Sequence, residues 1–265
     1  MIVVFTDLDG TLLDHETYSW EPARPALDAL ARRRVPLILC TSKPRAEIEP
    51  LRSALGNRHP FIVENGGAAF LPQGYFPFAV PGAASRDGYE VIEFGNRYVE
   101  LVEALRLAAH TAGVPVRGFS VMTAAEISER SGLSPEKSRL AKLREYDEPF
   151  YILDPSRERI LLREIEVLGK RWTRGDRFFH ITGSNDKATA VRRLMELYRQ
   201  AHGTVTTIGL GDAPNDAEFL AVVDNPVLIR SRFSAALQAL VPNGRLTARP
   251  GPYGWNEAIL EMVPE

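Results

Sequence analysis

Met1-Ile-Val-Val-Phe-Thr-Asp7-Leu-Asp9-Gly10-Thr11-Leu-Leu-Asp14 is the stretch that decides the fold of this chain. Its apolar run, Ile2 to Phe5, predicts a buried β-strand that ends at two carboxylates, and Gly10 allows a sharp turn after them. Acids at the carboxyl end of a strand lie where open α/β sheets bind ligands. Because close carboxylates repel each other, they need a cation or a shared proton, and both needs suit phosphoryl transfer. The alternative is a strand followed by an ordinary polar turn, since so short a motif also arises by chance.

The residues that follow alternate between helical and strand patterns. Helices are predicted at Pro22–Arg34 and Arg45–Leu55, and strands at Val35–Cys40 and Phe61–Val63. This βαβαβ order predicts a parallel sheet with helices on both faces. The pattern resumes at Gly183. The predicted fold class is therefore α/β, with a Rossmann-like, doubly wound parallel-sheet core.

An insertion interrupts this alternation. Glu64-Asn65-Gly66-Gly67 breaks the rhythm, and short helices and strands in a less regular order follow. We predict a core made of residues 1–83 and 183–265, and an inserted α+β domain made of residues 84–182. The strands predicted inside the insertion are Tyr89–Phe94, Val114–Phe119, Phe150–Leu153, Arg171–Thr173 and Phe178–Ile181.

Composition argues against several classes of function. The 265 residues carry a formal net charge of −2, which disfavours a nucleic-acid partner and gives no polybasic membrane signal. No stretch approaches the length of a membrane span, and the first residues lack the basic start of a signal peptide. The single cysteine, Cys40, cannot form an intrachain disulfide, as expected in a reducing compartment. The cytoplasm is the expected location.

Further polar patches end predicted strands or begin predicted helices. Thr41-Ser42 follows the strand Val35–Cys40, Lys187 lies in the first turn of a helix, and Asp212 and Asp216 follow a strand at 205–210. Hydroxyl and backbone N–H groups at a helix start suit phosphate oxygens, and acids recruit a hard cation such as Mg²⁺. A lysine in a first helical turn opposes the helix dipole, so an anion beside it would explain its place.

Each patch also has an ordinary structural explanation. Thr41-Ser42 fits a plain helix N-cap, Lys187 a solvated surface lysine, and Asp212 a helix-capping loop. Zinc and nucleotides are disfavoured, because the sequence has no His or Cys cluster at metal spacing and no glycine-rich nucleotide-binding loop.

Together, and in this order, the patches resemble the four motifs of the haloacid dehalogenase superfamily, and the insertion resembles its type C2 cap. The resemblance implies an aspartyl-phosphate mechanism in which Asp7 is the nucleophile and Asp9 the general acid and base. Thr41 would hold the transferring phosphoryl group, and Lys187 would balance charge. The implied cofactor is Mg²⁺, replaceable by Mn²⁺ or Co²⁺. Its implied ligands are Asp7, Asp9 through the backbone carbonyl, Asp212 and Asp216.

A closer resemblance is to the mannosyl-3-phosphoglycerate phosphatases. The stretches that carry it are Phe5–Asp14, Thr41-Ser-Lys43, Val63–Gly67, Arg144-Glu-Tyr-Asp-Glu-Pro-Phe150 and Gly209–Asp216. It implies hydrolysis of mannosyl-3-phosphoglycerate to phosphate and the osmolyte mannosylglycerate. The residues expected to bind this substrate are Ser42, Lys43, Arg45, Asn65, Gly66, Gly67, Arg144, Tyr146, Glu148 and Ser184.

The sequence alone leaves several alternatives open. The glycine pair at 66–67 fits a turn into a hairpin, and the stretch from Arg144 fits a solvated loop. His180, which lies where the chain returns to the core, fits a structural histidine at least as well as a ligand contact. Another substrate, such as sucrose phosphate, glucosyl-3-phosphoglycerate or a hexose phosphate, would suit the same core. An aspartyl-phosphate signalling module of the receiver kind and an inactive sugar-phosphate binder are less favoured. A receiver-like module has no role for Asp9 or for the insertion, and an inactive binder would not need all the expected catalytic residues.

Overall fold

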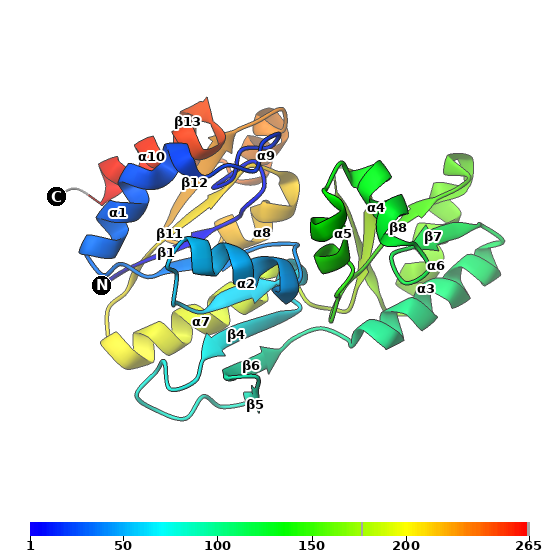
Figure 1. Cartoon of the computed structure of the whole chain (residues 1–265), viewed down its shortest axis with the longest axis horizontal. Coiled ribbons are helices and arrows are strands. Elements are labelled where there is room, and N and C mark those ends of the chain that lie inside the picture. The colour runs from blue at the N-terminus through cyan, green and yellow to red at the C-terminus, as the bar shows by residue number, and fades with distance from the viewer. Residues whose placement is uncertain (176, 264–265) are drawn as a thin grey trace.

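A nine-stranded sheet forms the larger part of the structure, a computed structural model that describes residues 1–175 and 177–263 (Figure 1). Six neighbouring strands, β13 to β3, run parallel, and three antiparallel strands extend the sheet beyond β3. The strands lie in the order β13 (Arg245–Pro250), β12 (Asn225–Arg230), β11 (Thr206–Gly211), β1 (Ile2–Thr6), β2 (Leu37–Cys40), β3 (Phe61–Val63), β4 (Ala68–Pro72), β6 (Tyr89–Glu93) and β5 (Ala84–Arg86).

Helices cover both faces of this sheet. Val4 and Phe5 are neighbours on β1 yet belong to different apolar clusters, because successive strand side chains point to opposite faces. The helices in the Val4 cluster are α1 (Arg24–Arg32), α2 (Arg45–Ala54) and α10 (Gly251–Met262). Those in the Phe5 cluster are α7 (Lys187–His202), α8 (Ala217–Leu220) and α9 (Ser234–Leu240). The predicted α/β class with a parallel core is thus confirmed.

A second, four-stranded antiparallel sheet with its own helices lies to one side of the first (Figure 1). We call this part the cap. Its strand order is β7 (Val116–Gly118), β8 (Glu148–Ile152), β10 (Phe179–Thr182) and β9 (Arg171–Arg174). Two helices, α3 (Tyr98–Ala112) and α6 (Glu158–Val167), pack with one face of this sheet. Two shorter ones, α4 (Ala124–Ser131) and α5 (Pro135–Ala141), belong to a separate small apolar cluster.

Two strands inside the predicted insertion belong to the large sheet. β6 pairs antiparallel with β4, Ala68 opposite Glu93, and β5 pairs with β6. The sequence predicted the strand at Tyr89–Phe94 but not the one at Ala84–Arg86, and it does not show which sheet either strand joins. We propose that the cap begins after Glu93 rather than at residue 84, and that residues 94–97 and 183–186 are its two connections to the core.

None of the helices within the described residues is long and apolar enough to cross a membrane.

Candidate active site

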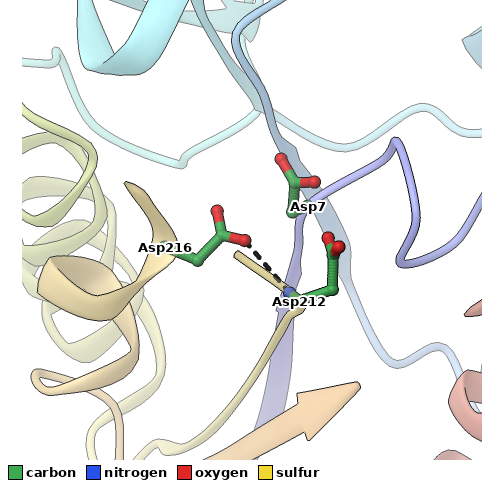
Figure 2. Close-up of side chains that lie close together, drawn as sticks. All are labelled: Asp7, Asp212 and Asp216. Carbon is green, nitrogen blue, oxygen red and sulfur yellow. Dashed lines mark hydrogen bonds between the residues drawn. The ribbon is translucent and has the colours of Figure 1, made fainter. Parts of the chain in front are cut away.

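Three aspartates gather at the carboxyl end of the parallel sheet (Figure 2). Asp7 follows β1 and Asp212 follows β11. These two strands are hydrogen-bonded neighbours, so both carboxylates reach the same edge. Asp216 comes from the short 3-10 helix η4 (Pro214–Asp216), and its Oδ2 accepts the backbone N–H of Asp212 at 3.1 Å. Gly211 permits this approach, since a Cβ there would lie 2.6 Å from the Cβ of Asp216. One oxygen from each aspartate lies within 4.8 Å of the others.

Lys187 is the cation that the structure places in this cluster. Its Nζ lies 2.8 Å from Asp7 Oδ1 and 2.7 Å from Asp216 Oδ1, and its side chain is only 2% exposed. Burial alone would lower the pKa of Lys187, but the two carboxylates raise it above its ordinary value. The solvated surface lysine that the sequence also allowed is therefore wrong.

One ammonium does not balance three carboxylates. Burial, and then repulsion from Asp216, raise the pKa of Asp7 well above its ordinary value and that of Asp212 to about 7. Lys187 opposes both shifts without cancelling them. The cluster therefore has an unmet demand for positive charge, which a proton or a cation would satisfy.

The donor set fits a divalent metal ion. Carboxylate oxygens are the ligands that hard cations prefer, and the Oδ1 of Asp212 is oriented by the hydroxyl of Thr11 at 2.9 Å. Gly10 leaves room beside the same carboxylate, because a Cβ there would lie 2.7 Å from Asp212 Oδ2. Asp9 Oδ1 is buried and has no hydrogen-bond partner among the described residues. The three buried aspartates could therefore bind a divalent metal.

Asp9 lies at the mouth of this cluster rather than within it. Its Oδ2 is 2.9 Å from Lys43 Nζ, and the same ammonium lies 3.6 Å from Glu47. Burial would lower the pKa of Lys43, but Asp9 and Glu47 keep it raised. Lys43, which the sequence suggested as a substrate ligand, is thus paired with the proposed acid–base residue.

Thr41 and Ser42 follow β2 beside the aspartates. Thr41 is buried, and its Oγ1 accepts the backbone N–H of Lys43 at 3.2 Å. Neither hydroxyl caps α2, because the N-cap residue of that helix is Pro44 and it makes no side-chain cap. Ser42 borders the large cavity described next.

A cavity of about 860 Å³ joins the aspartates to the cap. Its core side includes Asp7, Asp9, Asn65, Lys187 and Asp212. Its cap side includes Arg144 and His180, together with residues that the sequence did not single out as ligands, namely Phe119, Trp172, Thr173, Arg174 and Phe178. The hairpin formed by β9 and β10 supplies many of these, and alternation along its strands is the only signal in the sequence that bears on them.

Two predicted sugar ligands do not reach this cavity. The hydroxyl of Tyr146 donates to Glu93 at 2.6 Å and accepts from Arg86 at 2.9 Å. Glu148 is fully buried and accepts hydrogen bonds from the hydroxyls of Tyr98 and Ser120. In this arrangement both side chains have protein partners and do not border the cavity.

Four other predicted substrate ligands also do not border the cavity. Arg45 pairs with Glu145 at 3.2 Å and with other carboxylates. A Cβ at Gly66 would lie 2.1 Å from the carbonyl oxygen of Asp186, and one at Gly67 would lie 2.3 Å from the Cβ of Tyr146. These glycines therefore permit packing of the chain on itself rather than on a ligand. The fourth, Ser184, is exposed on a connection between core and cap.

The stretch from Arg144 to Phe150 instead holds the cap to the core. The Glu64 carboxylate accepts the backbone N–H groups of Glu145 and Tyr146 at 2.8–3.2 Å. Arg144 Nη1 donates to the carbonyl of Ser42 at 2.8 Å. Asn65 Nδ2 donates to Asp147 at 3.2 Å. Since Glu64 and Asn65 both have positive φ, their loop adopts a costly conformation that presents these side chains to the cap.

Comparisons with known proteins agree with this geometry. The family described as haloacid dehalogenase-like hydrolase matches residues 4–74. The chain is 42% identical to a glucosyl-3-phosphoglycerate/mannosyl-3-phosphoglycerate phosphatase of Methanococcoides burtonii, over 98% of this chain and 97% of that protein. It is 36% identical to a protein of the same name from Persephonella marina, over 100% and 98% of the two chains. A solved subclass IIB sugar phosphatase of the haloacid dehalogenase superfamily has the same fold, with a TM-score of 0.68 and 17% identity over 99% of both chains.

Proposed function

We propose a catalytic function from one premise: the chain belongs to the haloacid dehalogenase-like hydrolases, among the glucosyl-3-phosphoglycerate/mannosyl-3-phosphoglycerate phosphatases. The membership predicted from its four motifs is thereby confirmed. The function is hydrolysis of the phosphate monoester of mannosyl-3-phosphoglycerate, and of glucosyl-3-phosphoglycerate, to the glycosylglycerate and phosphate. The relatives' names support both sugars, so the glucosyl ester becomes a substrate rather than a competing assignment.

In the first step Asp7 is the nucleophile. A carboxylate oxygen of Asp7 attacks phosphorus, the bond from phosphorus to the C3 oxygen of glycerate breaks, and Asp9 gives its proton to the departing oxygen. Lys187 fixes Asp7 through the 2.8 Å contact to Oδ1 and supplies positive charge beside the phosphoryl group. Thr41 and Ser42, which follow β2 beside Asp7, would hold phosphoryl oxygens.

In the second step water releases the phosphate. Asp9, now a carboxylate, takes a proton from water as the water oxygen attacks the phosphorus of the aspartyl-phosphate. The bond between phosphorus and Asp7 breaks, and both the Asp7 carboxylate and the proton on Asp9 are restored. One group therefore acts as acid and then as base, which suits a carboxylate at the mouth of the buried cluster.

The metal that we assign to this site is Mg²⁺. Asp7, Asp212 and Asp216 would hold it together with the backbone carbonyl of Asp9, and when bound it supplies positive charge that offsets the phosphoryl oxygens. Asp216, which already bonds Lys187 and the Asp212 amide, would orient the other ligands.

The observation that carries this proposal is the pairing of a fully buried lysine with two of three aspartates at a strand edge. Burying these charges costs free energy, and charged groups of this kind cluster at functional sites. A full-length match to phosphatases names the reaction.

Phosphate release by the purified protein tests the proposal. The substrates are mannosyl- and glucosyl-3-phosphoglycerate, sucrose phosphate and glucose 6-phosphate, each with Mg²⁺ and with EDTA. We expect metal-dependent release with preference for the two glycerate esters, and no turnover by Asp7→Asn, because an amide is a poor nucleophile. Faster turnover of sucrose phosphate or the hexose phosphate would overturn the substrate assignment. Substantial release by Asp7→Asn would overturn the mechanism.

A further inference from the structure

His180 presents its side chain to the cavity from the middle of the cap sheet. Its neighbours on β10, Phe179 and Ile181, pack into the apolar cluster with α3 and α6, so His180 points to the opposite face. It lies in register with Pro149 of β8 and Thr173 of β9, and all three border the cavity. His180 therefore faces the cavity that a substrate would occupy.

A buried carboxylate fixes the orientation of this ring. Both oxygens of Asp147 lie close to His180 Nδ1, at 2.9 and 3.0 Å. Because an ionised carboxylate only accepts hydrogen bonds, Nδ1 carries the hydrogen. Burial would raise the pKa of Asp147, but His180 and Arg144 hold it below its ordinary value. Beside Nε2 lies Gly175, where a Cβ would come within 3.0 Å, so the absence of a side chain leaves room at this nitrogen.

The pair formed by Asp147 and His180 is tied to the core beside the phosphoryl site. Asn65 donates to Asp147 from the core loop, and Arg144 joins the same carboxylate at 3.6 Å while donating to the carbonyl of Ser42. Asn65, Ser42 and Arg144 all border the cavity. His180 therefore sits at the boundary between core and cap, not deep inside the cap.

The chemistry of the substrate, which rests on the proposed function, determines which substrate group lies next to His180. In a 3-phosphoglycerate ester the carboxylate carbon is four bonds of about 1.5 Å from phosphorus, hence within roughly 5 Å of it. A side chain that binds the carboxylate must therefore lie near the core, whereas the sugar extends further into the cap. Arg171 is a cation that also links the cap to the core here, but its guanidinium pairs with Asp186 and Glu218.

We propose that His180 is a specificity-determining residue: oriented by Asp147 at Nδ1, its ring donates an Nε2 hydrogen to the glycerate carboxylate of the substrate in the enzyme–substrate complex. The ring then lies between two carboxylates, one from the protein and one from the substrate, and both ring nitrogens act as donors. Asp147 is a positioning residue that acts through the ring. The enzyme thereby selects glycerate esters over phosphates that lack a carboxylate.

Two matched variants separate recognition from folding. His180→Asn keeps an amide near the place of Nδ1, so the bond to Asp147 can form, but it removes the group at Nε2. His180→Gln carries an amide to the place of Nε2. Each is assayed with mannosyl-3-phosphoglycerate, with the analogue whose carboxylate is replaced by a hydroxymethyl group, and with p-nitrophenyl phosphate.

We expect His180→Asn to lower kcat/KM for the glycerate ester by about 10- to 100-fold, the range for a hydrogen bond to a charged group. Its rates with the analogue and with p-nitrophenyl phosphate should change by less than about threefold. His180→Gln should restore much of the selectivity, measured as the ratio of kcat/KM for the glycerate ester to kcat/KM for the analogue. Asp147→Asn should lower this ratio. An equal loss on all three substrates, or an unchanged ratio in His180→Asn, would overturn the proposal. If the wild-type enzyme itself shows no preference for the glycerate ester, the proposed function fails, and this inference with it.

Discussion

Replacing Lys187 by methionine tests the electrostatics of the active site directly. Methionine has a similar volume but no charge, so the variant removes the contacts of 2.8 and 2.7 Å to Asp7 and Asp216 and leaves three buried carboxylates. Two unit charges 4.8 Å apart repel by about 3.5 kcal/mol at an effective dielectric constant of about 20. Breaking a buried ion pair by removing one partner costs about 3–5 kcal/mol. We expect a loss of that size in the free energy of unfolding at pH 8 in EDTA.

The same reasoning predicts how the loss is relieved. The pKa values of Asp7 and Asp212 are already raised, so each contributes stability below its unfolded pKa and loses it as pH rises through the folded value. Without Lys187 the fall in the free energy of unfolding with rising pH should be steeper. The difference in the free energy of unfolding between the variant and the wild type should shrink at pH 5, where protons bind the carboxylates. It should also shrink in Mg²⁺, because a cation then replaces the ammonium.

Urea denaturation followed by circular dichroism measures both effects. The conditions are pH 5 and pH 8 in EDTA, and pH 8 with saturating Mg²⁺. Lys170→Met is the control, since Lys170 is only partly buried and lies on the cap outside the aspartate cluster. A deficit below about 1 kcal/mol, or one that is identical under all three conditions, would refute the account of a charge-deficient site.

Further variants test the loop beneath the cap and the acid–base residue. Burial raises the pKa of Glu64 to about 8, so the free energy of unfolding of the wild type should fall between about pH 4.5 and 8. In urea denaturation, Glu64→Gln should flatten this fall by roughly 1 kcal/mol per pH unit. Parallel plots of the free energy of unfolding against pH for the two proteins would contradict it. Gly66→Ala should lower the free energy of unfolding by about 2 kcal/mol or more in the same assay, because φ is +85° and the Cβ would lie 2.1 Å from a carbonyl oxygen. The control Gly56→Ala, which has positive φ but open space around the Cβ, should cost less. Equal losses would argue against the close approach at Gly66. Asp9→Asn should remain folded, because Glu47 still pairs with Lys43, and it should lower kcat by about 10²- to 10⁴-fold. A wild-type rate of phosphate release would remove the acid–base role of Asp9.

The core side of the site could be predicted from sequence because its residues are fixed by strand ends. Asp7, Thr41 and Asp212 each follow an apolar run, and parallel strands that share a sheet bring their carboxyl ends to one edge. Lys187 could be found because a lysine at a helix start is unfavourable without an anion. These inferences need no knowledge of how the insertion docks.

The cap side could not be predicted in this way. Which face of β10 looks toward the core depends on how the whole cap docks, and the sequence records only that His180 alternates with Phe179 and Ile181. The sequence also could not show that β5 and β6 join the large sheet, because strand pairing depends on how the chain folds back on itself. The resemblance to the phosphatases indicated that Tyr146 and Glu148 have a role, but it could not show whether they contact a ligand or a neighbouring element of the protein.

That distinction changes what the stretch from Arg144 to Phe150 does. The backbone N–H groups of residues 145 and 146 bond Glu64, while Asp147 bonds both Asn65 of the core and His180 of the cavity wall. Docking of the cap and orientation of His180 therefore depend on one continuous set of hydrogen bonds. Any motion that carried the cap away from the core would break the Asn65 contact and loosen the histidine at the same time. We infer that the cavity has its substrate-selective form only when the cap is docked, so that closure and recognition of the glycerate are one event.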